Sequence, residues 1–432
     1  MKKIIVAGAG HGGVTAALNL AKAGYKVTVY EKKQKNQLGY DWVDCMRKDT
    51  FEETGFPCPD ESVFTDMADQ AYYNPKKSVK VVVEKDYGGR LGYIERKLLI
   101  NHIIDFAQEN GVKFVFGAEV VCALYDETRV TGIKIKKNGR EKDVFADMVI
   151  DAAGLNSPVR STLPECFGVR RHAHRDEIFC TWRGSFRKTA EFKTEPKNTI
   201  YFYHCGKSGM DWVIDEGETV DILIGGFGEL TEKQINDALE DFRADYPIDS
   251  TPVRGGYGDS IPLGRVLSVM VCNSYAAVGN SAFMTEPLSG SGIDMSMHAG
   301  KILADTIIEA KDNFSTEKLW KYNYTAFKNH GEHQYNNIIV KSFLAFLTAD
   351  DIDFFFEKKI LTAREIGGGG NTKYTLPDLV QKVSILGKPK LILPLTGILK
   401  KAMLLEKLKR DIPEAYNKTA VAKWKNEYSK VR

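Results

Sequence analysis

Three glycines near the start of the chain constrain its fold more than any other feature. Gly8, Gly10 and Gly13 match the pattern G-x-G-x-x-G, in which x is any residue. An apolar run at residues 4–7 precedes them, and an alanine- and leucine-rich segment with helical spacing follows at residues 14–23. A strand, a tight turn and a helix in this order begin the βαβ unit that binds dinucleotides.

The chemistry of these residues fits such a ligand. Gly8 permits the tight turn, Gly10 lets a pyrophosphate approach the backbone, and Gly13 lets the helix and the strand pack closely. The helix N-terminus offers N–H groups and a partial positive charge to the phosphates. Glu31 ends the next strand, where its carboxylate can accept hydrogen bonds from ribose hydroxyls. This motif alone does not distinguish FAD from NAD.

The composition indicates a folded protein with two or three domains. Of the 432 residues, 43% are hydrophobic and 27% are charged. The chain starts directly with a strand, and it has no run of about 18 apolar residues, so we expect neither a signal peptide nor a spanning helix. Seven cysteines without a C-x-x-C pair favour a reducing, cytoplasmic location. No metal is expected at His172, His174 and Cys180, because no second ligand pair flanks them.

A second glycine-rich segment lies at residues 275–293. A strand-like run leads into Gly279, and further glycines precede a helix predicted over residues 292–311. The segment resembles the second FAD signature of the p-hydroxybenzoate hydroxylase-like flavoproteins. The resemblance implies FAD contacts at Asn280, Pro287, Gly290, Gly292 and Ile293. Asn280 stands where that family has an aspartate, which holds the ribityl chain.

Residues 149–160 complete the resemblance. Ser157 and Arg160 match the family's middle signature, whereas Ala153 replaces its acid. Arg96 begins a predicted helix, as does the family arginine that reaches toward FAD. The resemblance thus adds Lys32, Arg96 and Gly154 to the predicted FAD contacts.

Within this superfamily the closest resemblance is to the geranylgeranyl reductase branch. The helix at residues 292–304 is similar to that branch, and Trp212 matches the tryptophan of its Tyr-x-Trp-x-Phe-Pro segment. Met210 replaces the tyrosine and Asp215 the proline. The resemblance implies that Trp212 and Met210 contact an isoprenoid or lipid-like substrate, whereas a tryptophan at such a position is more often a core residue. It also places Cys45 near the flavin, as a proton donor or as an apolar filler.

The resemblance predicts an α/β fold. It consists of a Rossmann-type FAD-binding domain (glutathione reductase-like, p-hydroxybenzoate hydroxylase subfold), an interleaved mixed-sheet substrate domain and a helical C-terminus. The FAD-binding domain is predicted in two parts, residues 1–165 and 265–312. The β-rich substrate domain is predicted at 166–264, and part of it is inserted into the first FAD-binding part at about 60–95. Residues 313–432 are predicted to form a basic helical region. Residues 34–65 show no regular pattern.

The predicted activity is FAD-dependent reduction of C=C bonds by hydride transfer from flavin N5. The same fold also serves monooxygenases that hydroxylate small aromatic or apolar molecules, halogenases and non-catalytic flavoproteins, so these remain alternatives. The electron donor is NAD(P)H or a reduced ferredoxin or flavodoxin. No second G-x-G-x-x-G occurs, so no separate NAD(P)H domain is expected.

The C-terminal segment is basic: residues 371–432 contain 14 Lys and Arg residues against 5 Asp and Glu residues. This excess favours an acidic partner or peripheral contact with an anionic membrane, with a solvated tail as the alternative; no nucleic-acid partner is expected. Residues 390–410 either lie in a membrane interface or form an amphipathic helix packed on the catalytic body or a second subunit. Pro394 and Gly397 are expected to break this stretch, and four glycines at 367–370 to interrupt the helical region.

Overall fold

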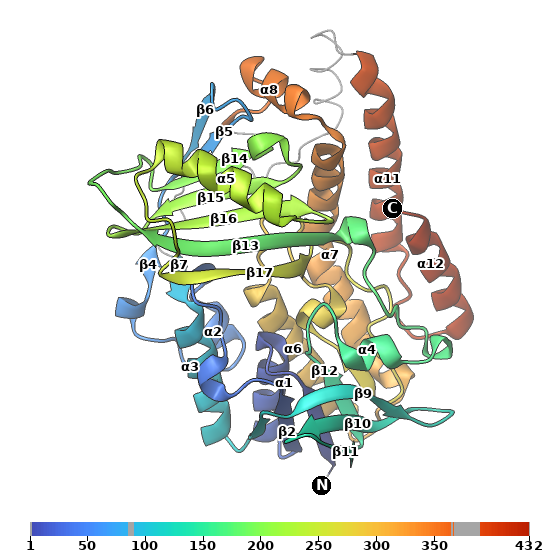
Figure 1. Ribbon diagram of the computed structural model, residues 1–432. Helices are drawn as coiled ribbons and strands as arrows, with labels where there is room; N and C mark the ends of the chain where they lie inside the picture. Colours follow the sequence, from blue (N-terminus) through green and yellow to red (C-terminus); the bar gives the residue numbers. More distant parts are fainter. Residues whose placement is uncertain (1, 85–89, 364–365, 367–388, 432) are drawn as a thin grey trace.

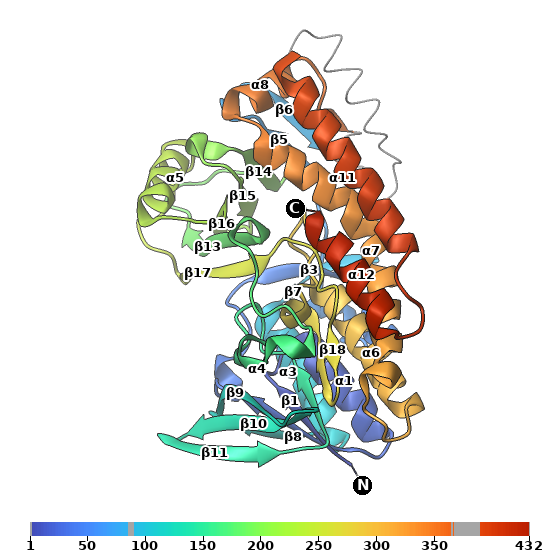
Figure 2. The same ribbon diagram turned by 90° about the vertical axis from the view of Figure 1, so that its right-hand side faces the viewer.

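The computed structural model describes residues 2–84, 90–363, 366 and 389–431. A Rossmann-type layer forms one end of the molecule, and a large mixed sheet lies above it (Figure 1). The C-terminal helices run along one side of both layers (Figure 2). This arrangement confirms the predicted α/β fold, with its mixed sheet and helical C-terminus.

The Rossmann layer is built on a six-stranded sheet of order β18-β19-β12-β1-β2-β8, in which all pairs except β18–β19 are parallel. Its strands are β1 (Lys3–Ala7), β2 (Lys26–Glu31), β8 (Lys113–Phe116), β12 (Met148–Asp151), β18 (Val271–Cys272) and β19 (Tyr275–Ala277). Both faces are covered, which explains why its central strands are apolar throughout. Helices α1 (His11–Lys22), α3 (Arg96–Glu109) and α6 (Ile293–Glu309) lie on one face.

A three-stranded antiparallel sheet covers the opposite face (Figure 2). It consists of β9 (Glu119–Tyr125), β10 (Val130–Lys137) and β11 (Arg140–Phe145). Asn138 and Gly139 join the last two strands with φ angles of 51° and 76°, the left-handed pair that a tight hairpin of this type requires. Asn-Gly is the pair of residues that favours this turn, so the sequence at 138–139 itself indicates the hairpin.

The upper layer is a seven-stranded sheet of order β17-β13-β16-β15-β14-β5-β6. Its strands are β5 (Gln70–Tyr73), β6 (Lys80–Val83), β13 (Ile178–Arg187), β14 (Asn198–Phe202), β15 (Met210–Asp215), β16 (Thr219–Phe227) and β17 (Arg254–Pro262). Only β14 and β5 pair in parallel. Helix α5 (Glu232–Asp245) covers one face of the sheet through a core that includes Phe186, Val213, Ile222 and Phe242. The other face is turned toward the Rossmann layer.

A small sheet of order β3-β7-β4 lies between the two layers. It is formed by β3 (Val43–Arg47), β4 (Thr65–Asp66) and β7 (Leu91–Glu95). The short helix α2 (Thr50–Glu53) follows β3, whereas the short helix α4 (Pro158–Thr162) follows β12 of the Rossmann layer. The prediction that residues 34–65 are irregular is therefore wrong. The partner of β3 lies almost 50 residues further along the chain, so no local pattern reveals the pairing.

The C-terminal region consists of α7 (Thr316–Phe346), α8 (Ala349–Glu357), α11 (Ile392–Arg410) and α12 (Lys418–Lys430). Helix α11 runs alongside α7 (Figure 2) and buries Leu405 and Leu408. Pro394 and Gly397 do not break it, contrary to the prediction. Pro394 lies in the first turn, where the missing N–H has no intrahelical partner to lose, and one glycine costs only ~1 kcal/mol. The four-glycine break predicted at 367–370 lies outside the described residues. None of the described helices combines the length and the hydropathy needed to span a bilayer.

Candidate functional site

One cavity of about 630 Å³ lies between the Rossmann layer and the seven-stranded sheet. Its walls come from the loop after β1, the β3 region, the lower face of the large sheet and the start of α6. The predicted site residues that line it are Gly10, Glu31, Cys45, Arg96, Gly154, Met210, Trp212, Asn280, Gly290, Gly292 and Ile293. The fold therefore brings together the two glycine-rich segments, although about 280 residues separate them.

The remaining predicted contacts lie elsewhere. Gly8 and Gly13 belong to the glycine loop but do not line the cavity. Pro287 is buried and does not line it either. Lys32 is exposed at the end of β2, whereas its neighbour Lys33 lines the cavity. The contacts of all these residues with FAD stay predictions.

The glycine loop is pressed against the end of β12. A Cβ at Gly8, whose φ is +89°, would lie 2.6 Å from the carbonyl oxygen of Ala152, and a Cβ at Gly10 would lie 2.9 Å from the same atom. A Cβ at Gly13 would lie 2.4 Å from the Cβ of Ala152. No side chain fits at any of these positions, so the loop presents bare backbone to the cavity.

Glu31 is fixed at the cavity wall by the backbone. Its Oε2 accepts a hydrogen bond from the Ala9 N–H at 2.9 Å, and its Oε1 accepts one from the Lys33 N–H at 2.9 Å. Each carboxylate oxygen keeps a further lone pair that can accept from a ligand hydroxyl. This position suits the ribose contact that the sequence predicts.

Ser157 and Arg160 of the middle signature hold the site together, whereas Gly154 of the same segment lines the cavity. Arg160 is buried and donates to the carbonyl oxygens of Ser281 at 2.5 Å and Arg171 at 3.0 Å. Ser157 donates to Asp151 at 2.5 Å, and Ser281 donates to Asp151 at 3.0 Å. These bonds join the middle segment to the turn that carries Asn280.

Two buried nitrogen atoms at the cavity have no hydrogen-bond partner among the described residues. They are Nε2 of His11 and Nε of Arg96. Burial and the Arg96 charge hold the pKa of His11 well below its usual range, so the imidazole is neutral. Unpaired buried polar atoms are costly, and a bound polar ligand relieves that cost. A nucleotide cofactor in the cavity therefore fits the residues present.

The start of α6 forms the opposite end of the cofactor site. Asn280 accepts a hydrogen bond from the Thr285 hydroxyl at 3.1 Å, which leaves its amide N–H groups available. Asp294, in the first turn of α6, accepts from the Thr50 hydroxyl at 3.0 Å and from the Arg47 N–H at 3.2 Å. Burial raises the pKa of Asp294 to about 6.

The large sheet forms a mostly apolar wall. Alternate residues of its strands point into the cavity because side chains of a strand alternate between its two faces. The apolar members are Phe179, Ile200, Met210, Trp212, Ile214, Leu223 and Ile261. The sequence predicted only two of them, since the others carry no motif. An apolar wall facing a nucleotide site suits a hydrophobic substrate.

One charged side chain, that of Arg183, lies within this apolar wall. The Arg183 guanidinium lies 5.2 Å from the ring centroids of both Trp42 and Trp212. One oxygen of Asp44 lies 3.1 Å from Arg183, and the other lies 3.0 Å from Arg96. Asp44 thus connects the sheet wall with the cofactor side. Sequence reasoning missed Arg183, because an arginine on a strand gives no sign that it is buried.

Cys45 and Tyr93 are neighbours in the small sheet. They are directly paired residues of β3 and β7, and both line the cavity. The Cys45 Sγ lies 3.7 Å from the Met67 sulfur. The Tyr93 oxygen accepts from the Asn198 amide at 2.8 Å, and burial raises the pKa of Tyr93 to about 12, so the phenol keeps its proton. Tyr93 was also missed, because no motif marks it.

These features define a class of protein. A Rossmann glycine loop, a second glycine-rich helix start and an apolar sheet enclosing one shared cavity belong to an FAD-dependent oxidoreductase. In agreement, residues 3–157 match the family model described as FAD dependent oxidoreductase.

Relatives and solved structures agree with this class. The chain is 22% identical to the digeranylgeranylglycerophospholipid reductase of Sulfolobus acidocaldarius, over 99% of this chain and 96% of that protein. It is 26% identical to digeranylgeranylglycerophospholipid reductase 1 of Methanococcoides burtonii, over 81% of this chain and 85% of that protein.

Two solved structures show the same fold. A geranylgeranyl bacteriochlorophyll reductase-like protein of Thermoplasma acidophilum superposes with a TM-score of 0.74 at 21% identity, covering 89% of this chain and 99% of that one. A p-nitrophenol 4-monooxygenase of Pseudomonas putida superposes with a TM-score of 0.64 at 16% identity, covering 88% of this chain and 98% of that one.

Proposed function

We propose that this protein reduces C=C bonds in the isoprenoid chains of a lipid, in the manner of the digeranylgeranylglycerophospholipid reductases to which it is similar. One observation carries the proposal: a single cavity joins both glycine-rich segments to an apolar sheet wall. A flexible apolar chain held against that wall lies within reach of a cofactor held by the glycine-rich segments.

The FAD-binding residues follow from the site. Gly10, Glu31 and Arg96 would hold the nucleotide half, and Asn280 with the N–H groups at Gly292 would hold the flavin half. When bound, FAD supplies a two-electron carrier that delivers hydride to one alkene carbon. The neutral His11 and the unpaired Nε of Arg96 are the polar groups that such a ligand would satisfy.

The substrate residues are Trp212 and Met210, with the other apolar residues of the wall. The charges of Arg183 and Arg96 are balanced by those of Asp221 and Asp44, so these four side chains add no net charge to the cavity. The apolar surface also excludes water from the reacting carbons. Trp212 sets the width of the cavity at this point, because its ring is fixed against Arg183.

Reduction of an alkene needs a proton as well as a hydride. We propose that the Cys45 thiol donates this proton to the second alkene carbon and is reprotonated from solvent, so the alkene gains two hydrogens in all. Tyr93, protonated and paired directly across from Cys45, supports the thiol by keeping an O–H beside it.

Mass spectrometry of the product tests the reaction. Protein reduced with dithionite and mixed with a geranylgeranyl lipid should give products heavier by about 2 Da for each reduced double bond. The flavin absorption spectrum of the same sample shows whether the cofactor is bound. A flavin-loaded protein that leaves every isoprenoid lipid unchanged contradicts the proposal, and substrate-stimulated NAD(P)H oxidation with oxygen uptake would instead indicate a monooxygenase.

Substitution of Cys45 tests the proton donor. Cys45→Ala should lower the rate of product formation about 100-fold, as expected for loss of a general acid, and Cys45→Ser should recover part of it. Cys58→Ala is the matched control, since Cys58 is also partly buried but does not line the cavity. Equal rates in both alanine variants would show that Cys45 only fills space.

The electron donor and the membrane contact are part of the proposal. NAD(P)H or a reduced ferredoxin or flavodoxin would reduce the flavin, and comparing their rates of bleaching the flavin absorption identifies the donor. Helix α11 would touch an anionic membrane, because Met403 is 72% exposed beside the exposed Lys400 and Lys407. Sedimentation with anionic but not neutral vesicles, weakened by Lys400→Glu, checks this contact.

A further inference from the structure

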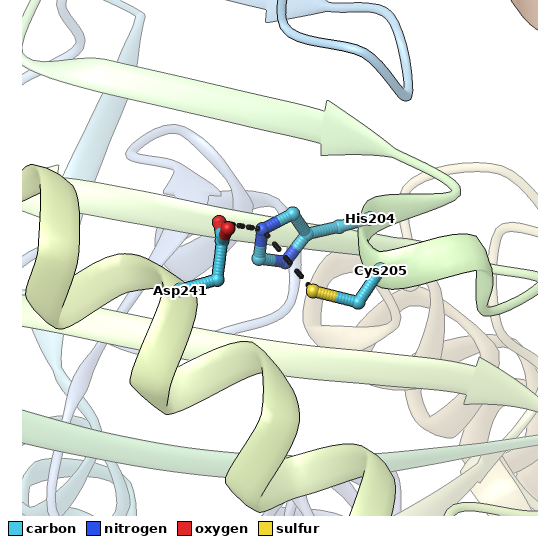
Figure 3. Close-up of side chains that lie close together, drawn as sticks. All are labelled: His204, Cys205 and Asp241. Carbon is cyan, nitrogen blue, oxygen red and sulfur yellow. Dashed lines mark hydrogen bonds and ion pairs between the residues drawn. The ribbon is translucent and has the colours of Figure 1, made fainter.

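Three side chains with metal-binding atoms meet on the face of the large sheet that is turned away from the cavity. His204 and Cys205 belong to the short helical turn η5 (His204–Gly206) between β14 and β15, and Asp241 lies on α5 (Figure 3). An imidazole nitrogen, a thiol sulfur and a carboxylate oxygen all lie within 4.8 Å of one another. Neither glycine-rich segment nor the substrate wall contributes to this cluster.

The separations are close to those of a zinc site. Cys205 Sγ lies 3.7 Å from His204 Nε2, and Asp241 Oδ2 lies 2.7 Å from the same nitrogen. Tetrahedral zinc, with bonds of about 2.0–2.3 Å, places such ligand atoms about 3.3–3.7 Å apart. The separation of Sγ from Nε2 therefore already matches a zinc site, whereas Asp241 Oδ2 has to move about 0.6 Å further from Nε2. Its side chain is 40% exposed, so it has room to do so.

The imidazole is held in the orientation that a metal ligand needs. Asp211, which is fully buried, lies 2.8 Å from His204 Nδ1. Its other oxygen is occupied by Lys207 at 2.7 Å and by the Gly225 N–H at 3.0 Å. A carboxylate that accepts from Nδ1 fixes the imidazole tautomer and turns Nε2 toward the metal, as in zinc sites generally. In addition, His204 stacks on Phe242 with ring centroids 4.3 Å apart, so the ring cannot turn away.

A lysine occupies part of the site. The Lys77 ammonium contacts Asp241 and also lies 2.5 Å from Asp245. Because Lys77 is a cation, it competes with a divalent ion for Asp241. Asp245 remains as an ion-pair partner for Lys77 when a metal ion binds Asp241.

We propose that His204, Cys205 and Asp241 bind Zn²⁺, with water as the fourth ligand, and so tie the η5 turn to helix α5. A set of one nitrogen, one sulfur and one oxygen ligand favours zinc over magnesium or calcium, which prefer oxygen alone. The two anionic ligands balance the charge of the ion.

The test uses the full-length, FAD-loaded protein stripped of metal. Titration with Zn²⁺ against a chromophoric chelator should show one site per chain, and Co²⁺ should give a thiolate-to-metal absorption band. Cys205→Ser should abolish that band and weaken Zn²⁺ binding at least tenfold. Cys166→Ser is the matched control, because Cys166 is also exposed and lies outside the cluster. His204 is left intact, since it is buried in the core beneath α5.

A substitution of Lys77 should change the Zn²⁺ affinity in the opposite direction. Lys77→Gln removes the competing cation, so it should tighten Zn²⁺ binding severalfold, whereas Asp241→Asn should weaken it. Zn²⁺ should also raise the Tm of the wild-type protein by a few degrees and leave that of Cys205→Ser unchanged. A wild-type protein without a zinc site, or a Cys205→Ser variant that binds zinc as tightly as wild type, would overturn the proposal. Both results are independent of lipid reduction.

Discussion

Arg183 and Asp221 form an ion pair inside the large sheet, with 2.8 Å between guanidinium nitrogen and carboxylate oxygen. The side chains are 3% and 1% exposed. They belong to the neighbouring strands β13 and β16, and Trp212 donates its indole N–H to Asp221 at 3.3 Å. Each charge is tolerated at this depth only because the other is present.

Removing one member of this ion pair should destabilise the folded protein. Asp221→Ala should lower the free energy of unfolding by about 3 kcal/mol, since the buried guanidinium then keeps, among the described residues, only Asp44 as an anionic partner. Urea denaturation measures the change. Glu165→Ala is the control: its partner is Arg171, the two side chains are 83% and 40% exposed, and such a pair contributes less than about 1 kcal/mol. Equal losses in the two variants would contradict the argument.

The double variant Arg183→Met with Asp221→Leu separates stability from activity. Replacing both charges by apolar side chains of similar size should restore most of the lost stability. Lipid reduction should stay impaired, because Trp212 loses its hydrogen bond and its cationic neighbour at the cavity. Recovery of both properties together would mean that the pair serves stability alone.

The substitution Gly13→Val should push helix α1 away from the sheet. The added Cβ would meet the Ala152 Cβ at 2.4 Å and the Val6 side chain at 2.9 Å, so the helix must shift. We expect a loss of at least ~2 kcal/mol of unfolding free energy and a large drop in FAD content, measured by absorption. The control is Gly397→Ala in α11, where a Cβ has no neighbour within 4 Å and stability should not fall.

Trp212→Phe should lower kcat/KM for a geranylgeranyl lipid by about tenfold, equivalent to ~1.4 kcal/mol of transition-state stabilisation. The smaller ring leaves a gap in the cavity wall beside Arg183. Trp182→Phe provides the comparison, because Trp182 packs on Phe186 on the opposite face of the sheet. Kinetics that change equally in both variants would remove Trp212 from the substrate site.

Asp294 should give the unfolding free energy of the apoprotein a pH dependence. Its pKa is raised from 3.8 to about 6 by burial, so between these pH values the folded state binds more protons than the unfolded state. The stabilisation is complete below about pH 4 and is lost as the pH rises through 6, by ~3 kcal/mol at most. Asp294→Asn keeps an acceptor for Thr50, and it should flatten this slope in denaturation measured from pH 4 to pH 7. An unchanged slope would assign the effect to other groups.

Several parts of this fold were predictable because their signals are local. The turn at Asn138 and Gly139 was one, since its left-handed backbone selects those residues. Strand β3 was not, because its pairing with β7 depends on a segment far along the chain. Helix α11 was misjudged for the same reason: packing against α7 outweighs the weak effect of Gly397.

The glycine pattern alone was enough to predict the cofactor half of the protein. At Gly8, Gly10 and Gly13 an added Cβ would collide with Ala152, so the constraint is visible directly in the residue type. Folding in three dimensions was needed to form the apolar cavity wall, the Arg183–Asp221 ion pair and the contact of His204 with Asp241. Those residues act through burial and neighbours brought from distant segments, and a single strand or turn gives no sign of either.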